Sequence, residues 1–307
     1  MDGPKLPDLE SLKYFESAAR LGSYTKAATE LFVTQAAVSQ QIRNLEERLG
    51  VKLFQRRGRT MVLTDVGESI VGDVTEGLDI LQTAMRRLAR HQQPNALTIT
   101  MMPSFASRWL IPRLWKFSSA HPDVELRLNP TSDVVDLSHS DMDLAVRLGD
   151  GNYPGLTAQW LMDDCAYAVA CPKIAEQIKE PSDVTKFLLV HGWVKSGMNW
   201  SRWFAKAGVK IGRKRLKQTV VNDGGLTVDM LLSGHGIGVT RHTLVKDLIE
   251  SGQLVKLFDV AIPGEYQYYM VHRSELDNNP VLNQFKQWLK QQAEDFEANC
   301  TILEKTK

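Results

Sequence analysis

The chain has 307 residues, of which 43% are hydrophobic and 24% charged, and its 37 Lys and Arg nearly balance its 36 Asp and Glu. This is the composition of an ordinary globular protein with two or three domains. Three cysteines are too few for a disulfide framework, and no stretch approaches the length of a membrane span. The first residues contain no apolar leader segment, so we expect a cytoplasmic protein.

The predicted elements begin with three short helices. Apolar residues recur at helical spacing over 9–19 and predict a supporting first helix. Ser23 and Thr34 stand where the N-caps of the next two helices are needed, and Phe32 and Val33 form the turn between them. The apolar stripe of the third helix consists of Val38, Ile42, Leu45 and Leu49. The pattern predicts a helix-turn-helix.

The opposite face of the third helix carries small or hydrogen-bonding side chains. Ala36, Gln40 and Arg43 point outward on this helix, and Gln35 and Ser39 flank them. A recognition helix needs this arrangement, because its first turns enter the major groove, where Gln and Arg side chains read base edges.

A basic hairpin is predicted after Gly50, which ends the third helix. Residues 51–54 and 61–63 have the pattern of two short strands, and 55–59 form a basic tip with the glycine that a tight turn requires. Over 43–59 there are six basic residues against two acidic ones, an excess that suits a phosphate backbone. The alternative is a small helical domain whose charged face is merely solvated.

The segment AATELFVTQAAVSQQIRNLEERLGVKLFQRRGRTMVLTDVGE resembles the winged helix-turn-helix of LysR-type transcriptional regulators. The runs FVTQAAVS and PSFASRWLIPRLWKF are similar to the branch with the glycine-cleavage activator and the AmpR-like regulators, so the likeness covers nearly the whole chain. The candidate DNA-binding residues are Ser23, Thr25, Thr34, Gln35, Ala36, Ser39, Gln40, Arg43, Arg56 and Arg59. Many members have Pro in place of Ala36 and Arg in place of Gln40, so no operator sequence carries over.

A long amphipathic helix is predicted over 65–93, with Thr64 as its cap. It would extend about 40 Å at the usual helical rise. Its apolar stripe either packs back on the same chain or pairs with a second chain. The resemblance implies the second use, as the dimerising linker helix of a homodimer or homotetramer. The candidate dimerisation residues are Val74, Leu78, Leu81, Met85 and Leu88.

The remaining chain, 94–307, alternates strands with helices and predicts βαβ units and a mainly parallel sheet. The expected strands lie at 97–101, 124–128, 142–147, 165–171, near 188–190, 219–221 and 236–240, and at 266–272. The expected helices include 105–118, started or kinked by Pro112, and 280–296. The fold class is therefore α/β: a winged helix-turn-helix domain (1–64), a linker helix (65–93) and a regulatory domain (94–307).

The regulatory domain resembles two-lobed periplasmic-type binding proteins. Lobe I is expected over about 94–165 and 268–300, and lobe II over about 166–267. An effector cleft would lie at the carboxyl ends of the strands. The candidate effector-binding residues are Ser104, Phe105, Thr131, Arg147, His191 and Asp223.

The best of these candidates is Ser104, at a helix N-terminus where hydroxyl and N–H groups suit a carboxylate; the alternative is a plain N-cap. With Arg147 in the same cleft, a small carboxylate or amino acid is favoured. Two alternatives remain open. Arg147 pairs structurally with Asp143 or Asp150, or Asp133 and Asp223 favour an amine-bearing ligand.

Other classes of protein fit less well. The sequence has no nucleophile elbow, no zinc-protease motif and no phosphate loop, and its seven histidines lack metal-ligand spacing. We therefore expect no enzyme, cofactor or metal. A solute-binding receptor fits the second half but not a winged helix. Cys165 and Cys171 lie roughly 20 Å apart along one strand and cannot form a disulfide there. The prediction is a regulator that binds operator DNA and an effector, and RNA polymerase if it activates transcription.

Overall fold

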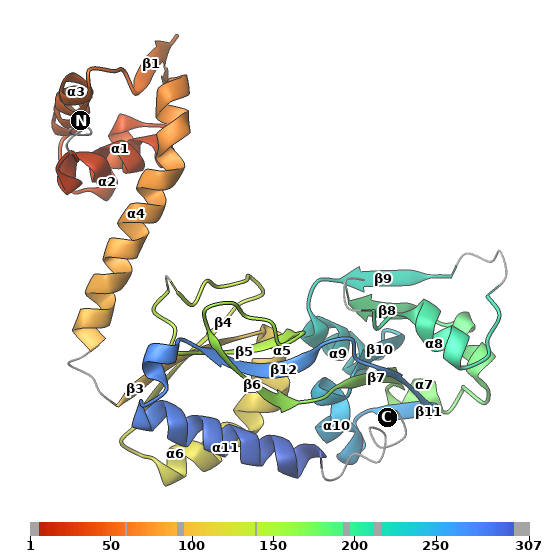
Figure 1. The fold of residues 1–307 in the computed structure, drawn as a ribbon. Coiled ribbons are helices and arrows are strands. Elements are labelled where there is room, and N and C mark those ends of the chain that lie inside the picture. Colours follow the sequence, from red (N-terminus) through yellow and green to blue (C-terminus); the bar gives the residue numbers. More distant parts are fainter. Residues whose placement is uncertain are drawn as a thin grey trace. The chain divides into compact units, whose positions relative to one another are not determined.

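The computed structural model describes residues 6–58, 60–90, 95–138, 140–192, 197–211 and 216–297. The chain divides into two compact units, residues 1–91 and 92–307 (Figure 1). The first unit contains the expected winged helix-turn-helix and the long helix. The second contains the expected two α/β lobes.

Three short helices form the core of the first unit: α1 (Leu9–Leu21), α2 (Tyr24–Glu30) and α3 (Gln35–Leu49). Both expected N-caps are confirmed. The Ser23 hydroxyl accepts a hydrogen bond from the Lys26 amide at 3.3 Å, and the Thr34 hydroxyl accepts one from the Ala37 amide at 3.2 Å. Gly50 ends α3 with a φ of 70°, a left-handed conformation that glycine adopts without strain.

The wing consists of strands β1 (Phe54–Arg57) and β2 (Thr60–Leu63), which pair antiparallel. The expected bounds of the first strand, 51–54, were wrong. The amides of Leu53 and Phe54 both donate to the buried Glu46 carboxylate, so the ladder begins only at Phe54. It then continues through Arg57, because ladder hydrogen bonds join backbones whatever the side chains are. The tip is therefore shorter than expected and contains Gly58, with a φ of 63°.

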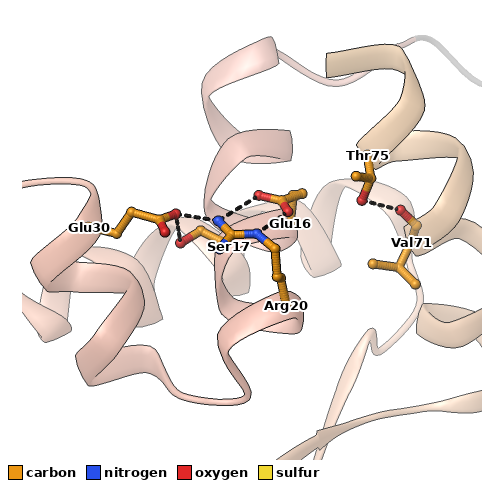
Figure 2. A network of polar contacts seen from close by, with 6 residues as sticks. All are labelled: Glu16, Ser17, Arg20, Glu30, Val71 and Thr75. Atoms are coloured by element: carbon orange, nitrogen blue, oxygen red, sulfur yellow. Dashed lines mark hydrogen bonds and ion pairs between the residues drawn. The ribbon is translucent and has the colours of Figure 1, made fainter. Parts of the chain in front are cut away.

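An ion-pair network joins α1 to α2 (Figure 2). Arg20 lies between two carboxylates, 2.7 Å from Glu16 Oε1 and 2.5 Å from Glu30 Oε1. The Ser17 hydroxyl donates to the same Glu30 oxygen at 2.9 Å. These bonds hold the pKa of Glu30 below its usual range, the Arg20 bond most. They fix the angle at which α1 supports the helix-turn-helix.

The long helix α4 runs over Asp65–Arg90. Its expected cap is confirmed, since the Thr64 hydroxyl accepts from the Gly67 amide at 3.1 Å. Ile70, Val71 and Val74 pack on the core of the first unit. The first half of the apolar stripe is thus used within the chain. In the same half, the Thr75 hydroxyl donates to the Val71 carbonyl at 2.8 Å (Figure 2).

Lobe I is a five-stranded sheet in the order β4-β3-β5-β12-β6 (Figure 1). The strands are β3 (Ala96–Met101), β4 (Glu125–Pro130), β5 (Leu144–Gly149), β6 (Thr157–Met162) and β12 (Gln267–His272). Helices α6 (Ile111–Ala120) and α11 (Pro280–Glu297) contribute Phe117 and Phe285 to its core. A short 3₁₀ turn, Ser274–Leu276, precedes α11.

The helical segment after β3 starts earlier than expected. It begins with α5 (Pro103–Phe105), passes through a π-helical turn (Ala106–Leu110) and continues as α6. The Ile111 amide bonds to the Ala106 carbonyl, which defines the wider turn. Pro112 does not start the helix; it follows the wider turn, as expected for a residue that has no N–H to donate.

Lobe II is a second five-stranded sheet, in the order β11-β7-β10-β8-β9 (Figure 1). Its strands are β7 (Cys165–Ala170), β8 (Leu189–Gly192), β9 (Gln218–Val221), β10 (Ile237–Arg241) and β11 (Val255–Pro263). Its helices are α7 (Pro172–Ala175), a 3₁₀ helix (Pro181–Lys186), α8 (Trp200–Lys206), α9 (Gly224–Leu232) and α10 (His242–Glu250). Cys165 and Cys171 are both buried, and neither forms a disulfide bond among the described residues.

The expectation of mainly parallel sheets was wrong. Within the two lobes, four strand pairings are parallel and four are antiparallel. The antiparallel pairings all involve β7 or β12, the first strand after each crossover between lobes. Each of these two strands therefore runs antiparallel to the neighbouring strands of its sheet. Their partners β6 and β11 were not predicted.

Ion pairs and hydrogen bonds join the two lobes. Arg113 of α6 forms a bidentate pair with Asp247 of α10, with both N–O distances at 2.8 Å. Arg108 pairs with Asp229 of α9. The Lys246 ammonium of α10 donates to the Phe296 carbonyl at the end of α11, at 2.8 Å. The lobes are therefore held by charge-assisted contacts as well as by their two crossovers.

Candidate functional site

The proposed DNA-contacting side chains lie mostly on the surface of the first unit. Ser23 and Ser39 are half-buried. The exposed candidates are Thr25, Thr34, Gln35, Ala36, Gln40, Arg43 and Arg56. Arg59 lies outside the described residues. The first two turns of α3 thus present Gln35, Ala36, Ser39 and Gln40 together with Arg43.

Several of these side chains already have partners. The Ser23 and Thr34 hydroxyls cap their helices, Gln40 Nε2 donates to Asn44 Oδ1 at 2.8 Å, and Arg56 Nε donates to the Gly58 carbonyl at 3.1 Å. Within the described part of the chain, the Gln35 and Arg43 side chains have no hydrogen bond or ion pair. Their polar groups are free to meet a ligand.

A buried carboxylate ties the recognition helix to the wing. Glu46 is 7% exposed, and its Oε1 accepts from the Leu53 and Phe54 amides at 2.9 and 3.1 Å. Its Oε2 lies 2.6 Å from the Lys52 ammonium. Burial alone raises the pKa of Glu46, but the bonds from Lys52, Phe54 and Leu53 together bring it below its usual value. The carboxylate stays ionised and fixes the wing beside α3.

The second half of the α4 stripe is uncovered. Leu78 is buried, whereas Leu81, Met85 and Leu88 are 42%, 62% and 62% exposed. Leu81, Met85 and Leu88 are spaced by four and three residues and therefore share one face. Among the five residues that the sequence suggested for dimerisation, these three have apolar surface to offer.

A cavity of about 170 Å³ lies between the lobes. Ser104 lines it from lobe I, and Thr227 and Arg241 line it from lobe II. The start of α9 lies beside Ser104, since a Cβ on Gly224 or Gly225 would meet the serine Cβ at 3.7 Å, an ordinary van der Waals contact. The Thr227 hydroxyl is buried and has no hydrogen-bond partner among the described residues. The cavity therefore has a cation and polar groups free to receive a ligand.

The cation of this cavity is held by a buried acid. Arg241 Nη1 lies 3.5 Å from Asp164 Oδ2, and Asp164 Oδ1 accepts from the Cys165 and Thr243 amides. Burial raises the pKa of Asp164 despite the opposing effect of Arg241. The ion pair is long and leaves Arg241 Nη1 without a hydrogen bond among the described residues. Asp164 belongs to the crossover between β6 and β7, so the ion pair connects the Arg241 guanidinium to a segment that links the two lobes.

Ser104 and Arg147 do not share a cavity, contrary to expectation. Thr131 and Arg147 line a separate cavity of about 430 Å³ inside lobe I, which adjoins the first at Met102 and Leu148. The suggested pairing of Arg147 with an aspartate is also absent from the described residues. Arg147 donates instead to the Val135 carbonyl.

The other three effector candidates line neither of these cavities. Phe105 is 1% exposed in the lobe I core, stacked on Trp109 with ring centroids 5.0 Å apart. His191 is buried, with Nδ1 3.0 Å from the Gly192 carbonyl. Asp223 caps α9 through a 2.7 Å bond from the Gly225 amide. Their neighbours Ser104, Gly192, Asn222 and Gly224 take the lining positions.

Sequence reasoning missed Thr227 and Arg241. Arg241 directly follows the predicted strand 236–240 and ends β10, so the rule that ligands lie at carboxyl ends of strands would have selected it. Thr227 lies inside α9 and carries no such signal. Among the described residues no cluster of side chains has metal-ligand geometry, and no described helix is long and apolar enough to cross a membrane.

A winged helix-turn-helix unit together with a two-lobed unit enclosing an interlobe cavity defines a ligand-responsive, DNA-binding transcription regulator. Residues 9–68 match the bacterial regulatory helix-turn-helix proteins of the lysR family, and residues 90–294 match the LysR substrate binding domain. The chain belongs to the LysR family of transcriptional regulators, whose C-terminal domains bind effectors.

Named relatives are similar over most of their length. The chain is 34% identical over 290 residues to the glycine cleavage system transcriptional activator of Escherichia coli (strain K12), covering 93% of each chain. It is 32% identical over 281 residues to the transcriptional activator AmpR of Citrobacter koseri, covering 92% of this chain and 96% of that one. The AmpR effector binding domain of Citrobacter freundii superposes with a TM-score of 0.58 at 22% identity, over 66% of this chain and 99% of that one, and shows the shared fold.

Proposed function

We propose that this LysR-type regulator binds its operator through α3 and the wing, assembles through α4, and responds to a small carboxylate in the interlobe cavity. RNA polymerase is a partner if the protein activates transcription, as its named relatives do. Catalysis has no part in this proposal, since the family members are transcription regulators.

The DNA contact rests on the exposed face at the start of α3. Gln35 and Arg43 are exposed and have no partner among the described residues, and both side chains can form bidentate bonds to base edges. Arg56 on the wing is exposed and suits a phosphate. Glu46 holds the helix and the wing in one arrangement. The two contacts would therefore engage the groove and the backbone together.

Assembly rests on the uncovered half of α4. Leu81, Met85 and Leu88 form an apolar stripe with polar faces on either side, and apolar stripes of this kind pair with a second helix. A homodimer joined in this way presents two recognition helices to a two-part operator. A homotetramer would pair two such dimers.

Effector binding rests on one observation: Arg241 lines the same small cavity as the Ser104 and Thr227 hydroxyls. A guanidinium and two hydroxyls surround a carboxylate well, because all three donate hydrogen bonds to it. A volume of about 170 Å³ suits a compact metabolite such as an amino acid. Asp164 links Arg241 to the crossover between lobes, so a ligand that competes for Arg241 would act on the hinge. The resulting shift in lobe or subunit packing would change the spacing of the DNA-binding units and the operator bend.

The experiment is a thermal-shift screen of small carboxylates and amino acids on the full-length protein, followed by Ser104→Ala. A ligand at about a hundred times its dissociation constant adds roughly 2.7 kcal/mol of stability, which such a screen detects. Ser104→Ala should abolish the effector response while operator affinity without ligand stays within about twofold, because the change removes one cavity donor and little volume.

Ser119→Ala is the matched control. Ser119 is exposed, lies near the end of α6 and lines neither cavity described above, so removal of its hydroxyl should leave the response intact. Loss of DNA binding in Ser104→Ala would show that the serine is structural. An unchanged ligand response in that variant would refute the interlobe site.

A further inference from the structure

The end of α11, a helix of lobe I, is held against α10 of lobe II (Figure 1). The Lys246 ammonium of α10 donates to the Phe296 carbonyl at 2.8 Å and lies 4.5 Å from the centroid of the Phe296 ring. The Arg113 guanidinium of α6 lies 5.1 Å from the same centroid. Cations attract an aromatic face, so these contacts hold the end of α11 in place. Together with His242, these three residues form the interlobe clasp.

His242 is the buried, titratable member of this clasp. It begins α10, is 6% exposed, and its ring centroid lies 5.1 Å from that of Phe296. Its Nδ1 is 2.8 Å from the Tyr167 hydroxyl of β7, whereas Nε2 is buried without a hydrogen-bond partner among the described residues. The ring is therefore shielded from water and has a polar partner at one nitrogen alone.

The charged groups near this ring are mostly positive. They are Lys246 and Asp247 of α10 and Lys256 of β11, whose ammonium lies 5.3 Å from the centroid of the Tyr167 ring. Asp247, the acid among them, is already engaged in the bidentate pair with Arg113. Burial, and after it the two lysines, lowers the pKa of His242 to about 4, against the opposing effect of Asp247.

Protonation of His242 would be unfavourable while the clasp is closed. The imidazolium has an N–H at both nitrogens, and the one at Nε2 would have no acceptor among the described residues. It would also add a buried positive charge beside Lys246. Moving the end of α11 away from α10 would admit water to the ring and remove both penalties. Acid therefore favours release of the clasp.

We propose that His242 is an acid-sensing residue whose protonation releases the end of α11 from α10 and loosens the contact between the lobes. His242 directly follows Arg241, which lines the interlobe cavity, so the released contact borders the effector site. The inference goes beyond the proposed effector response, because His242, Lys246 and Phe296 line neither cavity described above.

The pH range of the release follows from the two states of the ring. In the closed clasp the pKa of His242 is about 4, and in water that of a histidine is about 6.5. Because the folded-state value is lowered, the clasp is at full strength above the ordinary value and weakens as pH falls from there toward about 4. At pH 5.5 the ratio of released to closed clasp should be about tenfold higher than at pH 7.5.

Hydrogen exchange of the full-length protein, followed by mass spectrometry at pH 7.5, 6.5 and 5.5, tests this inference. After correction for the intrinsic exchange rate at each pH, protection of peptides from 285–297 should fall about tenfold between pH 7.5 and pH 5.5. In His242→Asn it should stay within about twofold, because the amide can still bond to the Tyr167 hydroxyl but does not titrate. The comparison between the two proteins removes the effects of other groups, including Asp164.

His235→Asn is the matched control, because His235 is an exposed histidine of the same lobe. This variant should keep the acid response of the unaltered protein. A response that persists in His242→Asn would overturn the proposal, as would constant protection in the unaltered protein. If His242→Asn does not fold, NMR titration of the His242 ring in the unaltered protein decides. A ring that titrates near its ordinary value while 285–297 stays protected would refute the proposal; one that titrates only as protection is lost supports it.

Discussion

Glu46 in the DNA-binding unit and Asp164 in the regulatory unit are both buried carboxylates, yet their pKa values shift in opposite directions. Glu46 receives two backbone amides and the Lys52 ammonium at hydrogen-bond distance. Asp164 receives two amides on one oxygen, while its other oxygen has only Arg241, at 3.5 Å. The two carboxylates therefore differ in their hydrogen bonding: both oxygens of Glu46 accept close hydrogen bonds, whereas only one oxygen of Asp164 does.

Because of this difference, Glu46 forms a fixed connection between helix and wing, whereas Asp164 forms an adjustable one with Arg241. A carboxylate with all its donors at 2.6–3.1 Å holds helix and wing in a single arrangement. A carboxylate whose cation is loosely held, beside a cavity, is able to exchange that cation with a ligand. The DNA-binding unit is thus built to keep one shape, and the regulatory unit to respond. The first unit also leaves the apolar stripe of Leu81, Met85 and Leu88 on α4 exposed.

The largest expected effect concerns that stripe. Leu81→Asp places a charge in a helix pairing that would bury it, which costs several kcal/mol. The variant should shift toward monomer in analytical ultracentrifugation and lose operator affinity. Gln82→Asp is the matched control, because it adds the same charge at an exposed polar position of the same helix. A fully dimeric Leu81→Asp protein would mean that the regulatory units form the main contact.

The next largest effect tests the fixed connection that Glu46 makes between α3 and the wing. Glu46→Ala leaves the Leu53 and Phe54 amides without an acceptor and should destabilise the DNA-binding unit by about 2–4 kcal/mol. Hydrogen exchange of peptides from 35–63 in rising urea measures this. Glu47→Ala, an exposed neighbour, is the control. All seven tryptophans lie between residues 109 and 288, so tryptophan fluorescence should show no change in the regulatory unit.

Lowering the pH should affect the two buried carboxylates, Glu46 and Asp164, in opposite ways. Because the folded-state pKa of Glu46 is lowered, its stabilisation is complete above the ordinary glutamate pKa and disappears as pH falls through the lowered value. Asp164 has a raised pKa, so its ionisation destabilises the fold above that value, and acid relieves the cost. Acid below the ordinary glutamate pKa should therefore weaken the exchange protection conferred by Glu46, while acid favours the regulatory unit through Asp164. Asp164→Asn should lose the second effect; if it does not, Asp164 is not the responsible group.

The smallest effect distinguishes two kinds of DNA contact. Gln35→Ala should cost about 1–3 kcal/mol on the specific operator and little on random DNA, because it removes a base contact. Arg56→Ala should weaken binding to all sequences and reduce the salt dependence by up to about one unit of slope, because it removes a phosphate contact. Binding measured over a salt series on both DNAs separates the two. Equal losses on both DNAs for Gln35→Ala would remove it from base recognition.

The sequence predicted the DNA-binding unit better than the ligand site, for a physical reason. Caps at Ser23 and Thr34 and the glycine at the end of α3 act over three or four residues, so a local pattern contains them. Ser104 and Arg241 meet only when two lobes fold against each other, and no local pattern joins positions so far apart. Arg147 shows the opposite error. The predicted strand ended at Arg147, but β5 continues to Gly149. The Arg147 side chain bonds to the Val135 carbonyl and lies over the Tyr153 ring, and it does not line the Ser104 cavity.

The bidentate pair between Arg113 and Asp247 limits how far the lobes can travel. Arg113 also donates to the Trp109 carbonyl at 2.9 Å and lies 5.1 Å from the ring centroids of Trp109 and Phe296, so it cannot follow Asp247 outward. Wide opening would break both N–O bonds at once. The interlobe cavity therefore exists before its ligand arrives, and little ordering remains to be done on binding. We therefore expect an effector to cause only a small repacking between lobes that stay closed.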